Sequence, residues 1–160
     1  MLEANETVAR HTVKKKLPSL YRVHPPPSDL KILQMKKTLN HYGVNSKKLN
    51  LNDSFGFSSI LNQLRKLPQF EALQVVLLRS MALAVYESKN QGHFGLAAEF
   101  YTHFTSPIRR YPDLVVHRAL KSQISKSQKK KSLKNMSLIQ KGFDEIGREI
   151  ALQCSQQERK

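Results

Sequence analysis

The stretch Tyr101-Thr-His-Phe-Thr-Ser-Pro-Ile-Arg-Arg-Tyr-Pro-Asp-Leu-Val-Val-His-Arg118 combines a helix-start signal, paired arginines and aromatic residues. Ser106 is a frequent N-cap type and Pro107 suits the first helical position, so the pattern predicts that a helix begins here. Arg109 would then lie in the first turn, where the helix dipole disfavours a cation. An anion bound by free backbone N–H groups and guanidinium groups would remove this conflict.

Pro112 leaves the start of this helix open. A proline inside a helix lacks its N–H and clashes with the preceding turn. Either the helix kinks at Pro112, or residues 107–111 form one tight turn and the main helix begins near Pro112. Before the turn, residues 93–104 alternate in apolar character and predict one clear strand that leads into it.

The rest of the chain predicts a mixed α/β fold that is mostly helical. Residues 19–24 are short and β-prone, and residues 121–137 form a basic, low-complexity segment that we expect to be a flexible loop around Lys129–Lys131. Both chain ends fall inside predicted helices, so residues 1–160 are expected to be part of a larger domain. Apolar periodicity and helix-end signals predict helices at 1–16, 29–42, 55–66, 70–86 and 138–160.

Charge is the strongest property of the composition. The 160 residues include 27 Lys and Arg against 12 Asp and Glu, which gives a net charge of +15. Such a balance favours a polyanionic partner, nucleic acid before an acidic membrane surface, over a merely solvated basic face. The sequence has no apolar run long enough to cross a membrane, no signal-peptide pattern and a single cysteine, Cys154, so a cytoplasmic location is expected.

The acidic residues and histidines are too dispersed to predict a metal site. Phosphodiester hydrolysis with metal ions usually needs a cluster of carboxylates, and no Asp-x-Asp run occurs. His93 and His103 are too far apart on an extended strand to bind one ion. Anion recognition remains, through the forked donors of Arg109, Arg110 and Arg118, with a solvated basic face as the alternative. Tyr101 and Tyr111 stay undecided between base stacking and packing.

These residues resemble a known family. The segments His93-Phe-Gly-Leu96, Tyr101-x-x-Phe-Thr-Ser-Pro-Ile-Arg-Arg-Tyr111 and His117-Arg118 are similar to the signature of the ribonuclease II and ribonuclease R family, with further likeness at Tyr21-Arg-x-His24. The resemblance implies a hydrolytic 3′-to-5′ exoribonuclease that degrades single-stranded RNA to nucleoside monophosphates with magnesium. It also implies that the family's aspartate cluster and its flanking OB-fold RNA-binding domains are missing from this chain.

The resemblance assigns roles to matching positions. Arg109 corresponds to the family arginine at the reacting phosphate, which makes it the predicted catalytic residue, stabilising charge in the transition state. Arg110, Tyr111, Ser106 and Arg118 are expected to bind RNA, as is Glu158 in Ser155-Gln-Gln-Glu158, for which a solvated acid at a helix end stays the alternative.

We therefore expect the C-terminal part of a ribonuclease catalytic domain. It would bind no metal of its own and be inactive alone, unless a separate chain supplies the aspartates. Two alternatives remain: a non-catalytic RNA-binding module, and a remnant that does not fold by itself.

Overall fold

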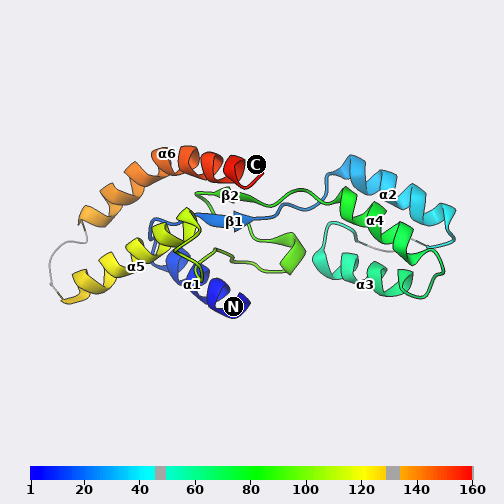
Figure 1. The fold of residues 1–160 in the computed structure, drawn as a ribbon, viewed down its shortest axis with the longest axis horizontal. Helices are drawn as coiled ribbons and strands as arrows, with labels where there is room; N and C mark the ends of the chain where they lie inside the picture. Colours follow the sequence, from blue (N-terminus) through cyan, green and yellow to red (C-terminus); the bar gives the residue numbers. More distant parts are fainter. Residues whose placement is uncertain (46–49, 129–133, 160) are drawn as a thin grey trace. The chain divides into compact units, whose positions relative to one another are not determined.

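A computed structural model describes residues 1–45, 50–128 and 134–159. These residues form two compact units, each with its own set of helices (Figure 1). The first comprises Met1–Val23, Ala84–His93 and Ala98–Lys160, and the second comprises His24–Leu83 and Phe94–Ala97. No helix in the described part combines the length and apolar character needed to span a membrane.

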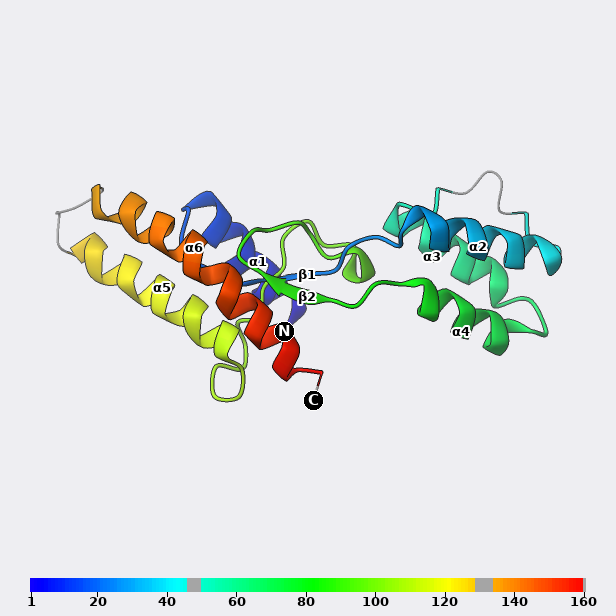
Figure 2. The ribbon, with the colours of Figure 1, turned by 90° about the horizontal axis from the view of Figure 1, so that it is seen from above.

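The first unit is built around a very short sheet. Its elements are α1 (Leu2–Lys14), β1 (Tyr21–Val23), β2 (Val85–Glu87), α5 (Tyr111–Gln128) and α6 (Lys134–Gln157). The two strands pair antiparallel, with Arg22 opposite Tyr86. In both ribbon views α5 and α6 run side by side (Figure 1 and Figure 2).

Backbone groups on both sides of this strand pair find partners. On one side, the N–H of Arg22 donates to the carbonyl of Tyr101 at 3.0 Å, and Tyr21 bridges to Thr102. On the other side, the N–H of Tyr86 donates to the hydroxyl of Ser155 on α6 at 2.8 Å. The segment before α5 and the end of α6 are thereby attached to the same three-residue strands, which places their side chains close together.

Two small apolar clusters hold the first unit together. Leu20 is fully buried with Tyr86 and Ala151 between the strands and α6, and Cys154 packs against this cluster. Burial raises the pKa of the Cys154 thiol, as expected for an unreactive packed cysteine. The second cluster joins α1 to β1 through Ala9, Tyr21 and Val23.

The second unit is a group of three helices with one short 3-10 turn. The elements are α2 (Asp29–His41), α3 (Ser54–Leu64), α4 (Phe70–Ser80) and η1 (Phe94–Leu96). His24 attaches η1, because the N–H of Gly95 donates to His24 Nδ1 at 2.8 Å while Nε2 donates to the carbonyl of Ala82 at 2.7 Å. A Cβ at residue 95 would lie 2.7 Å from that Nδ1, so only glycine fits. The core of this unit consists of Ile32, Met35, Leu39, Val44, Leu51, Phe57, Ile60, Leu64, Leu73 and Leu77.

The mixed, mostly helical fold agrees with the sequence prediction, but the strand predicted at 93–104 is wrong. Residues 94–96 form η1 instead, and the chain reverses so that His93 and Ala98 bridge to each other. Ala97 adopts a left-handed backbone at φ 52°, which no strand contains. Of the predicted strand, Tyr101 and Thr102 contact the sheet, through the hydrogen bond from Arg22 and the bridge to Tyr21.

Three helix boundaries also differ from the prediction. The helix predicted at 70–86 ends at Ser80, because residues 85–87 pair with β1 as β2. The basic segment 121–137 is not a loop throughout, since α5 continues to Gln128 and α6 begins at Lys134. Lys129–Lys131 lie outside the described residues. Of the two possibilities for the helix at Pro112, the structure has the later start, at Tyr111.

The buried face of α2 contains only some of its leucines. Leu30 and Leu33 are exposed, whereas Ile32, Met35 and Leu39 are buried against α4 and the rest of the core. Helical periodicity identifies a stripe but not which of two adjacent leucine rows meets a neighbour, because that choice depends on the packing of distant elements.

Replacing Leu39 by Ala should therefore destabilise the chain strongly. Leu39 is 2% exposed in the core, so its truncation should lower the free energy of unfolding by about 2–5 kcal/mol. Leu30→Ala on the same helix, where the leucine is 65% exposed, should change it by less than about 0.5 kcal/mol. Urea denaturation followed by circular dichroism measures both. Equal losses would contradict the observed helix face.

Candidate functional site

The arginine pair lies on a tight turn that precedes α5. The N–H groups of Arg109 and Arg110 both donate to the carbonyl of Ser106, at 3.3 and 3.2 Å. Since α5 begins at Tyr111, Arg109 is not in the helix, and the predicted conflict with the helix dipole does not occur there. Asp113 occupies the first turn, where a carboxylate is favourable.

Asp113 anchors the turn from inside the protein. Its carboxylate is fully buried and accepts the N–H of Ser106 at 2.7 Å. The guanidinium of Arg110 binds the same carboxylate at both oxygens, through Nε and Nη2, each at 2.9 Å. These hydrogen bonds raise the pKa of Arg110, so it stays charged and committed to Asp113. A bidentate pair of this kind fixes both ends of the turn.

Aromatic and amide contacts hold the chain on the N-terminal side of the turn. The ring of Phe104 stacks on His117 of α5, with centroids 4.3 Å apart, and His117 Nε2 donates to the Phe104 carbonyl at 2.9 Å. Asn5 of α1 accepts the N–H of Phe104 at 3.1 Å and donates to the hydroxyl of Tyr101 at 3.1 Å. Tyr101 is therefore a buried packing residue and not a surface for base stacking.

A second polar cluster joins four residues that are far apart in the sequence. Glu158, just after α6, forms an ion pair with Arg22 of β1, and accepts the hydroxyl of Tyr86 of β2 at 3.1 Å. The same hydroxyl contacts His103 Nδ1 at 2.7 Å. The guanidinium of Arg22 lies over the Tyr86 ring, 4.7 Å from its centroid.

The two clusters interact electrostatically. Burial, together with the neighbouring charge of Arg110, lowers the pKa of His103 to about 4. Burial likewise raises the pKa of Tyr86, and the neighbouring Glu158 carboxylate adds to this. His103 is therefore neutral and Tyr86 protonated at physiological pH. Neither can supply charge, but both can direct hydrogen bonds.

The predicted site residues divide into two groups. Arg109, Arg118 and Tyr111 are exposed and form no side-chain hydrogen bond or ion pair with the described part of the chain. Ser106 and Arg110 are instead joined through Asp113. Arg109, Arg118 and Tyr111 are therefore available to bind a ligand, whereas the guanidinium of Arg110 binds Asp113 within the protein.

Glu158 is the one predicted RNA-binding residue that lies in the second cluster. Sequence reasoning gave no role to Arg22, Tyr86 or His103. No local spacing could have found them, because only the pairing of β1 with β2 and the attachment of α6 bring them together.

The described residues do not fit a magnesium site. Within them, no three His, Cys, Asp or Glu side chains lie close enough to hold one metal ion. The buried Asp113 is already satisfied by Ser106 and Arg110. We therefore assign no metal-dependent step to this part of the chain.

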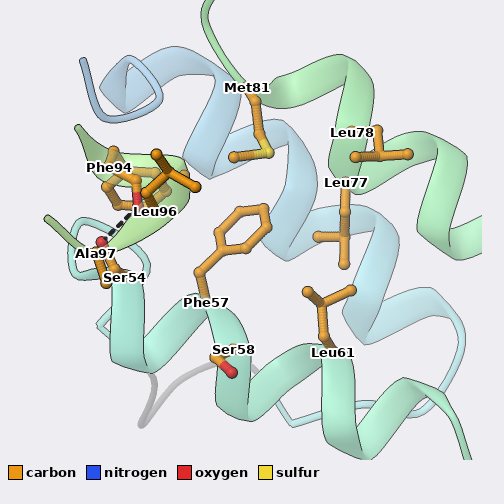
Figure 3. A pocket seen from close by; sticks show the side chains of 11 residues that line it. Ser54, Phe57, Ser58, Leu61, Leu77, Leu78, Met81, Phe94, Leu96 and Ala97 are labelled. Carbon is orange, nitrogen blue, oxygen red and sulfur yellow. Dashed lines mark hydrogen bonds between the residues drawn. The ribbon is translucent and has the colours of Figure 1, made fainter. Parts of the chain in front are cut away.

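A pocket of about 460 Å³ lies in the second unit. Figure 3 shows Phe57, Leu77 and Met81 projecting into it, with the hydroxyl of Ser54 donating to the carbonyl of Phe94 at 2.8 Å. Its lining contains no titratable side chain. It offers no chemistry for an anion, so the candidate site is the turn before α5 together with the Glu158 cluster.

Comparison with known proteins identifies one family. The model of the RNB domain matches residues 1–126. Ribonuclease R of Escherichia coli is 43% identical over 128 residues, which cover 80% of this chain and 16% of that protein. The chain thus spans less than a quarter of the length of the curated relatives it matches.

Solved structures give the same result. Mycoplasma genitalium RNase R in complex with ribose methylated single-stranded RNA is similar with a TM-score of 0.83 and 33% identity, over 99% of this chain and 24% of that one. Yeast Ssd1, described as a pseudonuclease, is similar with a TM-score of 0.67 and 26% identity, over 97% of this chain and 20% of that one.

Removing the Asp113 carboxylate should destabilise the first unit. Asp113→Ala leaves the Arg110 guanidinium without its partner and the N–H of Ser106 without an acceptor, so we expect a loss of about 3–5 kcal/mol in the free energy of unfolding. The exposed Asp29, in the first turn of α2, is a matched control whose change to Ala should cost less than about 1 kcal/mol. Urea denaturation measures both, and similar losses would contradict the anchoring role.

The lowered pKa of His103 predicts a pH dependence of stability. A histidine in the unfolded chain titrates near 6.5 and His103 in the folded chain at about 4. The unfolded state therefore binds more protons between these values, and the free energy of unfolding should fall as the pH is lowered from 6.5 to 4. His103→Asn removes the titrating group and should make this fall smaller. Urea denaturation at a series of pH values tests it; an unchanged pH dependence in the variant would refute the shift.

Proposed function

Because the chain belongs to the RNB-domain family and is similar to ribonucleases R, we propose that it forms the arginine-bearing part of the RNA site of a hydrolytic 3′-to-5′ exoribonuclease. This proposal rests on the different surroundings of Arg109 and Arg110. Arg110 is tied to the buried Asp113, and this leaves the adjacent Arg109 exposed on a turn that is fixed from within.

This arrangement suits a phosphate. A guanidinium presents forked donors that match two phosphate oxygens, and a rigid support reduces the entropy lost when it binds. We propose that Arg109 contacts the reacting phosphate and stabilises charge that develops there. Arg118 and Tyr111, exposed on α5, would contribute further RNA contacts, and the net charge of +15 would add attraction for the backbone.

We further propose that the substrate is single-stranded RNA. One ribonuclease R structure similar to this chain is in complex with ribose methylated single-stranded RNA, and another is in complex with double-stranded RNA. Nucleotide release would need carboxylates for magnesium that the described residues do not provide. Residues 1–160 alone should accordingly bind RNA without degrading it, unless a further segment supplies the aspartates. We place this reaction in the cytoplasm.

A non-catalytic RNA-binding module is the second candidate. It is favoured by the same lack of a metal-binding cluster in the described part of the chain and by the similarity to Ssd1, a pseudonuclease. The two candidates differ in one respect: a half-site regains nuclease activity when the missing carboxylates are supplied, whereas a module does not.

The role of Arg109 predicts a specific loss of RNA affinity. Arg109→Ala should weaken binding of a labelled single-stranded RNA by about tenfold, the effect of losing one good guanidinium contact. Arg79→Ala removes an exposed arginine of the second unit and serves as a control for charge alone. Fluorescence anisotropy at fixed salt measures both. If Arg109→Ala and Arg79→Ala both lower the RNA affinity by the same small factor, the turn before α5 acts only as a nonspecific basic surface.

A nuclease assay on the same protein preparations distinguishes the exoribonuclease half-site from the non-catalytic RNA-binding module. With magnesium, the chain alone should release no nucleoside monophosphates from single-stranded RNA. Addition of the aspartate-bearing segment of a ribonuclease R relative should restore release with the wild-type chain and not with Arg109→Ala. Binding without restored release would favour the module.

A further inference from the structure

We propose that Tyr86 and His103 are positioning residues that hold the Glu158 carboxylate in a fixed orientation for contact with the ribose hydroxyls of RNA. This inference rests on the proposed function. It adds two residues that act through Glu158 and need not touch RNA themselves. Three observations carry it: the direction of the hydrogen bonds, the ion pair on the opposite side of the carboxylate, and the attachment of α6 to β2.

The direction of the hydrogen bonds follows from what each group can donate. An ionised carboxylate only accepts, so the Tyr86 hydroxyl must donate its single proton to Glu158 Oε1, 3.1 Å away. The Tyr86 oxygen is then an acceptor toward His103 Nδ1 at 2.7 Å, which requires the proton of neutral His103 to be on Nδ1. The result is a directed chain from His103 through Tyr86 to Glu158.

Arg22 holds the other oxygen of the carboxylate. Its Nη1 contacts Glu158 Oε2, while its guanidinium rests on the Tyr86 ring, 4.7 Å from the centroid. Each carboxylate oxygen is thus held by one partner and retains a lone pair that can accept a hydroxyl. The positive charge of Arg22 also offsets the negative charge of Glu158, so the carboxylate can lie beside an RNA phosphate with less repulsion.

The attachment of α6 to β2 holds Glu158 beside Tyr86 and Arg22. Ser155, three residues before Glu158, accepts the N–H of Tyr86 at 2.8 Å and so attaches the end of α6 to β2. The side chain of Glu158 is 38% exposed, which leaves it open to a ligand despite its two partners. A carboxylate at a free helix end would sample many rotamers, and a ribose contact would have to overcome that entropy.

A double-mutant cycle on the full chain tests whether Tyr86 acts through Glu158. The variants are Tyr86→Phe, Glu158→Ala and the double variant, and the readout is the ratio of affinities for a single-stranded RNA and a DNA of the same sequence. This ratio cancels the nonspecific gain expected from removing a negative charge. Tyr86→Phe should lower the preference for RNA by about fivefold, and should lower it no further once Glu158 is absent.

His103 variants give an independent measurement. Asn carries an N–H near the place of Nδ1 and can still donate to Tyr86, whereas Leu cannot. His103→Asn should retain most of the RNA preference, and His103→Leu should lose it about as much as Tyr86→Phe does. Tyr42→Phe, which removes an exposed hydroxyl in the second unit, is the matched control and should leave the ratio unchanged.

The outcomes separate this inference from the function on which it rests. A wild-type chain that does not bind RNA overturns both. A wild-type chain that prefers RNA, with Tyr86→Phe unchanged, or with Tyr86→Phe equally harmful in the Glu158→Ala background, overturns the positioning role alone. Circular dichroism at the assay temperature confirms that each variant is folded, and a lower midpoint of unfolding with an unchanged affinity ratio also counts against the proposal.

Discussion

The buried carboxylate of Asp113 is the constraint on which the candidate site depends. It has no exposed surface and is satisfied by one backbone N–H and one bidentate guanidinium. Burial of an unpaired carboxylate would be very unfavourable, so the turn from Ser106 to Arg110 must close over it. Arg110 is used internally for this purpose, and Arg109 is left exposed beside it. One acid thereby decides which of two identical neighbours can meet a ligand.

In the second cluster a carboxylate is again held by partners from the protein, but this carboxylate is partly exposed to solvent. Glu158 keeps part of its surface open while Arg22 and Tyr86 hold one oxygen each. His103 contributes as a neutral hydrogen-bonding group because burial disfavours its charged form. In this cluster the partly exposed Glu158 is supported by Arg22 and Tyr86 from other segments of the chain, and this support converts a flexible side chain into an oriented one.

The sequence predicted what depends on local pattern. The helices near 29–42 and 55–66 were found from apolar spacing and end signals, and the stretch containing Arg109 was identified because several signals coincide there. Features set by distant contacts were missed. The predicted strand at 93–104 gives way to η1, where Gly95 packs on His24, and the helix predicted to reach 86 ends early because Tyr86 pairs with β1. Alternation and periodicity contain no information about such partners.

The order of the segments in the first unit has a consequence for how the chain acquires its structure during synthesis. The second unit is nearly continuous, from His24 to Leu83, so its helices can pack as soon as that segment is made. The first unit is interrupted by it: β1 must wait for β2, more than sixty residues later, and for α6, which is synthesised later still. Contacts of such long sequence separation form slowly. Until α6 is complete, the N–H of Tyr86 and the apolar side chain of Leu20 lack their final partners, so unpaired backbone and apolar surface of the first unit stay exposed.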